Sequence, residues 1–259
     1  MIDLNWKKKN IFLILCGSSV SIMESDVMGR KSPLHDRQTS TLEIKPFDYL
    51  ESSVFFPGYS NEDKLLAYGI LGGIPRYLGA FDPNLSIEKN IANKIICNGA
   101  YLHEEPDNLL KAELREINVY SSILAAIANG RNKVVDIANY IHEERTKVSK
   151  YLITLQTLRL IEKRIPCGDK ETSKKSIYVI KDNFFEFWFR YEFTNNSYYA
   201  MLGANDASKE IMEDISNLMG DVFEDICKEY LIRLAKCRKL PFIPYHLGKW
   251  WGTNPALKA

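Results

Sequence analysis

Few residues in this chain have the spacing that a catalytic or phosphate-binding motif requires. The nearest approach is Gly29-Arg30-Lys31-Ser32, which contains the glycine, lysine and serine of a phosphate-binding loop. In that loop, GxxxxGK[ST], the lysine directly follows the second glycine, and successive backbone N–H groups surround the phosphates. Here Arg30 intervenes, and the preceding residues predict a helix where the motif needs a strand. We therefore predict no Walker A motif, and no predicted strand ends in the paired acids of a Walker B motif.

Metal ligands and nucleophiles are equally sparse. The four histidines lack metal-ligand spacing, and no Ser/His/Asp or Cys/His arrangement stands out. Glu224, on a predicted helix, could be a metal-binding carboxylate, but beside Asp221 and Asp225 a solvated acid is the simpler interpretation. The cysteines contain no CxxC pair, which favours reduced thiols over a disulfide framework or a metal site. They are Cys16, Cys97, Cys167, Cys227 and Cys237.

Residues 131–175 carry the strongest charge signal. They contain eleven Lys and Arg against six Asp and Glu, a local net charge of +5 in a chain whose formal net charge is +1. Lysine and hydroxyl side chains contact phosphates and base edges in protein–DNA complexes. A solvated helix or a protein-contact surface is the alternative interpretation. The residues predicted to contact DNA are Thr146, Lys147, Ser149 and Lys150 on a helix and Lys170, Lys174 and Lys175 on a following loop.

The elements that would position these side chains follow one another closely. Apolar residues recur at i, i+3, i+4 and i+7 over 120–127, and shorter apolar stripes follow over 134–141 and 148–155. Residues 160–164 and 177–180 have the pattern of two strands joined by a polar loop. Three helices followed by a two-stranded hairpin predict a winged helix-turn-helix.

Two short apolar segments precede this region. Residues 11–16 have the continuous apolar character of a buried parallel strand, and residues 41–44 alternate like a second strand. The three lysines at positions 7–9, followed by this apolar run, resemble the beginning of an export signal. The run over 11–16 is shorter than the roughly 7–15 apolar residues that such a signal needs. Because parallel strands need neighbours and helical cover, we expect the chain to begin within a domain.

Helices are predicted over most of the remaining chain. The expected segments are 61–71, 75–78, 87–97, 107–116 and a helix or helix pair over 207–236. Seven of the ten residues in 184–193 are aromatic. These rings could stack on bases, but a hydrophobic helix that packs between domains is the favoured interpretation.

The composition limits the classes of protein to which this chain can belong. The chain has 259 residues, 46% hydrophobic and 26% charged, which is enough apolar content for packed cores and excludes a disordered chain. No stretch approaches the ~20 apolar residues of a membrane span. We therefore predict a cytoplasmic protein, mainly α with minor β structure, that does not enter a membrane.

Several collinear segments together match a known protein family. They are Ile14-Leu15-Cys16-Gly17-Ser18-Ser19, Met28-Gly29-Arg30-Lys31-Ser32-Pro33-Leu34 with Arg37 and Thr39, Pro46-Phe47, Gly72-Gly73-Ile74-Pro75-Arg76-Tyr77-Leu78, Phe187-Trp188-Phe189-Arg190-Tyr191, Met219-Gly220-Asp221-Val222-Phe223-Glu224-Asp225-Ile226-Cys227 and Gly248-Lys249-Trp250-Trp251-Gly252. These segments resemble a prokaryotic, predominantly archaeal family of P-loop ATPases. Its AAA-like members are related to the signal-transduction ATPases with numerous domains, and carry a winged helix and a PD-(D/E)XK nuclease-like region after the ATPase module.

The resemblance implies roles for five residues. Ser18 matches the sensor-1 residue near the γ-phosphate, and Gly73 and Pro75 match a GxP motif of the helical lid near the adenine. Arg37 matches the first arginine of a phosphate-sensing Gly-Arg-Arg-Thr motif, although Asp and Gln replace its glycine and second arginine here. Glu224 matches the first-helix acid of the nuclease-like fold. The rest of that nuclease motif would lie beyond residue 259.

The resemblance also implies a division of the chain. Residues 1–58 would be the back of the ATPase core, 59–115 the helical lid, 116–182 the winged helix and 183–259 the start of the nuclease-like region. ATP and Mg²⁺ are the implied cofactors, but without Walker A and B motifs we expect no productive binding and no catalysis by this chain alone. The leading hypothesis is an incomplete nucleotide-dependent switch coupled to a winged helix. The alternative is a nucleotide-independent DNA-binding regulator or an adaptor for a protein partner, and an active nuclease would need a metal site.

Overall fold

The structure, a computed structural model, describes residues 12–17, 29–30, 32, 35 and 39–251. The chain divides into two units, residues 1–43 and 44–259, and each is described by itself. In the first unit, residues 12–17 form neither helix nor strand, and Phe12 and Ile14 are 87% and 73% exposed. The prediction of a buried strand over 11–16 is therefore wrong for the part of that segment that the structure describes.

The second predicted strand, residues 41–44, is also wrong. Leu42 and Ile44 are exposed, and the segment belongs to no sheet. Among the described residues the only sheet pairs two strands between Ile161 and Ile180. A parallel strand persists only where neighbouring strands complete its hydrogen-bond ladder, so an apolar run by itself does not make one.

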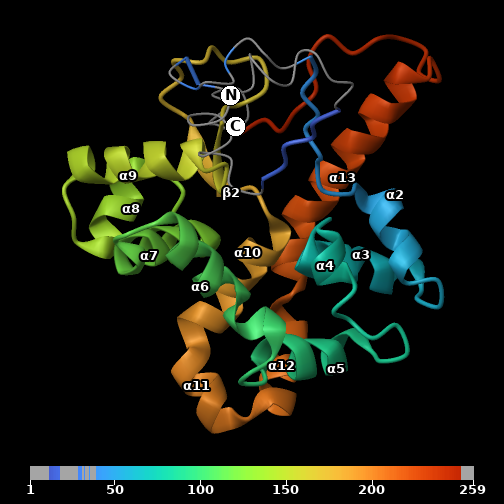
Figure 1. Cartoon of the computed structure of the whole chain (residues 1–259), viewed down its shortest axis with the longest axis vertical. Helices are drawn as coiled ribbons and strands as arrows, with labels where there is room; N and C mark the ends of the chain where they lie inside the picture. The colour runs from blue at the N-terminus through green and yellow to red at the C-terminus, as the bar shows by residue number, and fades with distance from the viewer. Residues whose placement is uncertain (1–11, 18–28, 31, 33–34, 36–38, 252–259) are drawn as a thin grey trace, which may run out of the picture. The chain divides into compact units, whose positions relative to one another are not determined.

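The described part of the second unit is mainly helical with one small antiparallel sheet (Figure 1). The coarse prediction of a mainly α chain with minor β structure is confirmed. Helices were expected at most of these positions, and η3, η4 and η5 are short 3-10 or π-helical turns between them. The elements are α2 Tyr49–Ser52, η3 Ser53–Phe55, α3 Asn61–Leu71, α4 Pro75–Leu78, α5 Ile87–Ile91, η4 Ala92–Ile96, α6 Tyr101–Glu113, α7 Ile117–Ala128, α8 Val134–Ile141, α9 Arg145–Thr157, β1 Ile161–Arg164, β2 Ile177–Ile180, α10 Asn183–Trp188, η5 Phe189–Phe193, α11 Thr194–Leu202, α12 Ala204–Asp214 and α13 Ser216–Lys236.

Capping residues explain where several helices begin and end. Ser60 Oγ accepts a hydrogen bond of 3.0 Å from the Asp63 N–H at the start of α3, and Gly72, with φ of 65°, ends that helix. Asp182 Oδ1 accepts one of 3.0 Å from the Phe185 N–H at the start of α10. Each of these bonds satisfies a backbone donor that the first helical turn leaves without a partner.

Helices α7, α8 and α9 precede the hairpin β1–β2, in the order predicted from the apolar pattern. Ile161 pairs with Ile180 and Arg164 with Ile177 across the hairpin. Helix α8 packs against α7 and α9, α7 packs against β2, and α9 packs against β1. The helices share one apolar interior, in which the buried residues include Ile123, Leu124, Ile137, Val148, Leu152 and Leu155.

The aromatic segment forms α10 and η5, and its rings are core. Phe184, Phe187 and Phe189 are fully buried, and Trp188 is 4% exposed. Helix α10 packs against α3, while η5 packs against α7 and α11 (Figure 1). The preference for a buried hydrophobic segment is confirmed for six of its seven rings; the seventh, Phe193, is 37% exposed.

The last helical region is a pair, α12 and α13, that meets at Ile215. Helix α13 packs against α3 and α12 through its first turns, where Leu218, Met219 and Val222 are buried. Farther along α13, Phe223 and Tyr230 are each 53% exposed. No helix in the described part of the chain is long and apolar enough to cross a membrane.

Candidate nucleic-acid interface

Helix α9 directs the side chains predicted to contact DNA away from its buried stripe. Val148 is fully buried, whereas Thr146, Lys147 and Lys150 are exposed and Ser149 is half-buried. The separation follows from the helical period, which puts residues three to four apart on one face. The solvent face of α9 is therefore mainly polar and basic, as the sequence predicted, and also carries Ile153, which is 62% exposed.

Three of these four side chains have intramolecular partners. Thr146 Oγ1 donates to Glu144 Oε2 at 3.5 Å. Lys147 Nζ donates to Glu143 Oε1 at 2.8 Å, and this hydrogen bond raises the pKa of Lys147. Ser149 Oγ donates to the Arg145 carbonyl at 2.8 Å within the same helix. Lys150 has no ion-pair partner among the residues that the structure describes. Lys150, like the exposed Arg145 at the start of α9, can therefore meet a phosphate without first giving up an ion-pair partner.

The loop between β1 and β2, here called the wing loop (residues 165–176), holds the other three predicted bases. Lys170 and Lys174 are exposed, and Lys175 Nζ lies 3.8 Å from Asp169 Oδ2. Asp169 Oδ2 also accepts a hydrogen bond of 2.9 Å from Ser173 Oγ. Asp169 therefore contacts two other residues of the wing loop, and it offsets the charge of one of the loop's three lysines.

A C-terminal segment, residues 248–251, contacts the wing loop. The Cys167 N–H donates to the Lys249 carbonyl at 2.8 Å, and Trp251 Nε1 donates to the Lys175 carbonyl at 2.9 Å. Gly248 also lies close, since a Cβ there would sit 3.6 Å from the Cβ of Cys167. These bonds join residues about 75 positions apart in sequence and hold the wing loop against the C-terminal segment.

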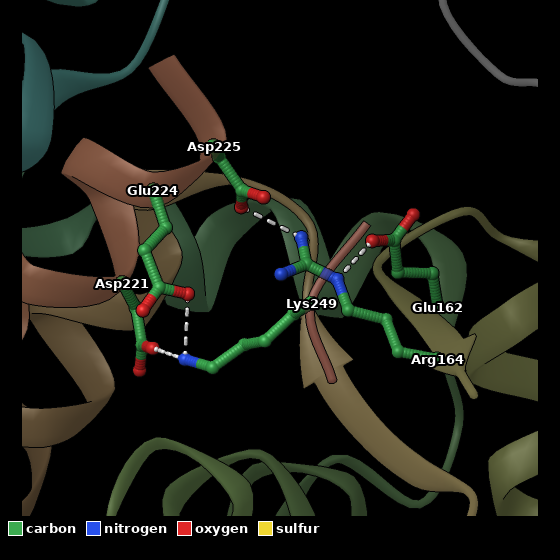
Figure 2. A network of polar contacts seen from close by, with 6 residues as sticks. All are labelled: Glu162, Arg164, Asp221, Glu224, Asp225 and Lys249. Carbon is green, nitrogen blue, oxygen red and sulfur yellow. Dashed lines mark hydrogen bonds and ion pairs between the residues drawn. The ribbon is translucent and has the colours of Figure 1, made fainter. Parts of the chain in front are cut away.

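Lys249 joins this segment to α13 (Figure 2). Its Nζ donates to Asp221 Oδ1 at 2.5 Å and lies 2.9 Å from Glu224 Oε2. Burial alone would lower the pKa of Lys249, but the hydrogen bonds to the two acids outweigh it and raise that pKa. The two acids lie at i and i+3 on α13, a spacing that puts both carboxylates on one face.

Arg164 makes the corresponding bridge from the hairpin (Figure 2). Its Nε donates to Glu162 Oε1 at 2.6 Å and its Nη2 to Asp225 Oδ2 at 2.8 Å. Burial would lower the pKa of Arg164, and the two acids raise it above its ordinary value. Strand β1 therefore contacts α13 through Arg164, and the C-terminal segment contacts it through Lys249. Each of these bases forms an ion pair with at least one acid on α13.

Glu224, the predicted nuclease-like acid, is exposed and paired with Lys249. The described residues contain no group of three or more His, Cys, Asp or Glu that could hold a metal ion. The Glu224 carboxylate is thus held as part of an ion pair.

The described residues of the lid motif have backbone roles. A Cβ on Gly73 would lie 1.9 Å from the Phe47 carbonyl oxygen, and the Phe47 N–H donates to the Gly73 carbonyl at 2.8 Å. Pro75 begins α4, where its missing N–H costs no hydrogen bond. Ser18 and Arg37 lie outside the described residues. Neither backbone role involves ATP, so nucleotide binding stays a prediction.

Sequence reasoning assigned no role to Lys249 or Trp251 and counted Arg164 toward the basic face. The structure instead turns Arg164 toward Glu162 and Asp225, where its charge is neutralised. The sequence did contain one indication of this network. The acids at positions 221, 224 and 225 share one helix face, and such a cluster is stabilised by positive charges nearby. The sequence does not say which of its 34 bases would supply them.

The comparisons with known proteins bear on this C-terminal region most directly. Residues 188–257 match DUF234, a family described as archaeal and bacterial proteins of unknown function. A protein of Methanocaldococcus jannaschii, named "Uncharacterized protein MJECL04", is 38% identical over 251 residues. That alignment covers 97% of this chain but 56% of the relative, so the chain spans little more than half of that protein's length. No solved structure gives a significant match.

The family match and the basic face occupy different parts of the chain. The matched residues include α13 and Lys249, and therefore one side of the polar network in Figure 2. They exclude α9 and the hairpin, which the relative covers. A function for α9 must therefore be argued from its own geometry.

Proposed function

We propose that residues 116–182 form a winged-helix module that binds double-stranded DNA, with α9 as the helix that enters the major groove and the wing loop on the neighbouring backbone. The observation that carries the proposal is the solvent face of α9, where Thr146, Lys147 and Lys150 are exposed opposite a fully buried stripe. The order of three helices and an antiparallel hairpin supports it.

The charges favour phosphate contacts over the reading of single bases. Lysine meets phosphate as a point charge, whereas base edges are read by bidentate pairs from arginine, asparagine or glutamine. Three of the four described bases without an acidic partner on these two elements are lysines, Lys150 on α9 and Lys170 and Lys174 on the wing loop; the fourth is Arg145. We therefore propose a module that binds duplex DNA with strong salt dependence and limited sequence preference.

The test is a gel-shift titration of duplex DNA between about 50 and 200 mM salt. Wild type is compared with the double variant Lys147→Ala/Lys150→Ala. Each phosphate contact adds about 0.9 to the slope of log K against log salt, so the double variant should lower the slope by up to about 1.8. Lys150→Ala alone should cost more affinity than Lys147→Ala, because Lys147 must leave Glu143 to reach DNA.

A matched control removes two exposed lysines elsewhere. Lys89 on α5 and Lys111 on α6 are both exposed, so Lys89→Ala/Lys111→Ala makes the same change in net charge. We expect this control to keep the wild-type slope. Equal slopes for all three proteins, or no duplex binding at the lowest salt, would refute the proposal and favour a protein-contact role for α9.

A further inference from the structure

A cavity of about 320 Å³ is lined by α6, the end of α10, η5 and α11, and none of its lining residues belongs to α9 or to the polar network in Figure 2. Two of its walls are aromatic: the ring centroids of Trp188 and Phe193 are 5.7 Å apart with a tilt of 40°. Trp188 is held in place by its Nε1, which donates to the His103 carbonyl at 2.9 Å. The lining residues are His103, Glu104, Asp107, Trp188, Phe193 and Asn196.

The polar atoms around this cavity are mainly acceptors. Glu104 and Asp107 are carboxylates with no ion-pair partner among the residues that the structure describes. Asn196 Nδ2 donates to Glu192 Oε1 at 2.7 Å, which leaves its Oδ1 as an acceptor. His103 Nδ1 lies 2.9 Å from the Ile95 carbonyl, so that nitrogen carries a proton and Nε2 accepts in the neutral ring.

A buried acid, Glu192, contacts two of the lining residues without lining the cavity itself. Glu192 lies in the π-helical turn η5, and its side chain is 2% exposed. Its Oε1 accepts from Asn196 and lies 3.5 Å from His103 Nδ1, so the carboxyl group touches two lining residues. Its Oε2 is buried without a hydrogen-bond partner in the described structure. A buried acceptor left in this state is costly, and a nearby cation would offset part of that cost.

We propose that this cavity binds a guanidinium group, from an arginine side chain or from a free arginine-derived amine. Guanidinium is planar, weakly hydrated and rich in donors, and it stacks on aromatic rings, so it suits the Phe193 ring, which is 37% exposed and has acceptors around it. None of the six lining residues is Lys or Arg, so no lining base competes with the ligand. Single-turn π-helices occur often at functional sites, and η5 carries both Phe193 and Glu192.

The test is calorimetric titration of the full chain with agmatine and with N-acetyl-arginine amide. The neutral urea isostere N-acetyl-citrulline amide is the ligand control, because it keeps the shape and loses the charge. We expect both guanidinium probes to bind and the isostere to bind much more weakly. Tighter binding of the blocked amino acid than of agmatine would assign the site to a peptide arginine, and the reverse to a free amine. The Trp188 indole N–H, assigned with Trp188→Phe, should shift in proton–nitrogen spectra as the site fills.

The protein control removes charge without changing shape. Glu104→Gln/Asp107→Asn should weaken guanidinium binding by about 3- to 30-fold, since each contact of this kind contributes modestly. The matched variant Glu62→Gln/Glu213→Gln alters two exposed acids on α3 and α12 and should bind as wild type. Equal binding of arginine and citrulline probes, wild-type affinity in the cavity variant, or no binding at about 10 mM probe would overturn the proposal.

Discussion

Replacing Glu186 by Gln should stabilise this protein at pH 8 and leave its stability at pH 4 nearly unchanged. Glu186 lies on α10 near the acids of α13 and is only partly exposed. Burial raises its pKa from 4.5 to about 7, and the charge of Asp221 adds to the rise. Arg164 and Arg190 act in the opposite direction but do not outweigh burial.

The sign of the effect follows from proton uptake. In the unfolded chain Glu186 loses its proton near pH 4.5, and in the folded protein near pH 7. Between these values the folded state holds the extra proton, so stability falls as pH rises, and above pH 7 the loss is complete. The full difference in pKa corresponds to about 3 kcal/mol, and because the side chain is partly solvated we expect about 1–3 kcal/mol.

The assay is urea unfolding of wild type and Glu186→Gln at pH values from 4 to 9. Glutamine has the same shape and no charge, so the variant should gain about 1–3 kcal/mol at pH 8 and close to zero at pH 4. Glu213→Gln, an exposed change on α12, should stay within about 0.5 kcal/mol throughout. Parallel pH profiles for wild type and Glu186→Gln, or a variant that is less stable at pH 8, would show that burial does not hold this carboxyl group protonated.

Three further pairs of substitutions test the packing and one helix cap, each by urea or thermal unfolding. Gly73→Ala should destabilise the protein by more than about 2 kcal/mol, because its Cβ would meet the Phe47 carbonyl. Gly220→Ala lies inside α13 with open space around it and should stabilise the protein by about 0.5–1 kcal/mol. The reverse order of stabilities would contradict the backbone contact at Gly73. Phe187→Ala should cost about 3–5 kcal/mol and Phe223→Ala far less, since the first ring is fully buried and the second 53% exposed; similar losses would argue against α10 as core. Asp182→Ala should cost about 1 kcal/mol and Asp182→Asn much less, because asparagine can still accept from the Phe185 N–H; equal losses would show that the cap adds little.

Local pattern was a good guide where neighbours in sequence are also neighbours in space. The apolar stripe of α9 and the strands of the hairpin lie where spacing put them, because both depend on contacts within a few residues or across one short loop. The same reasoning misjudged residues 11–16 and 41–44. An apolar run becomes a strand only when another segment completes its ladder, and nothing local reports whether that segment is present.

The candidate sites divide in the same way. The basic solvent face of α9 was predictable, since a helix with one buried stripe must present its remaining side chains to water. The network of Lys249 and Arg164 with the α13 acids was not, and neither was the cavity beside Trp188. The sequence by itself determined which residues are apolar, which are charged and which helices they form. Only the tertiary structure decided which charges meet and where acceptors gather around two rings, because those contacts join segments tens of residues apart through packing rather than through local periodicity.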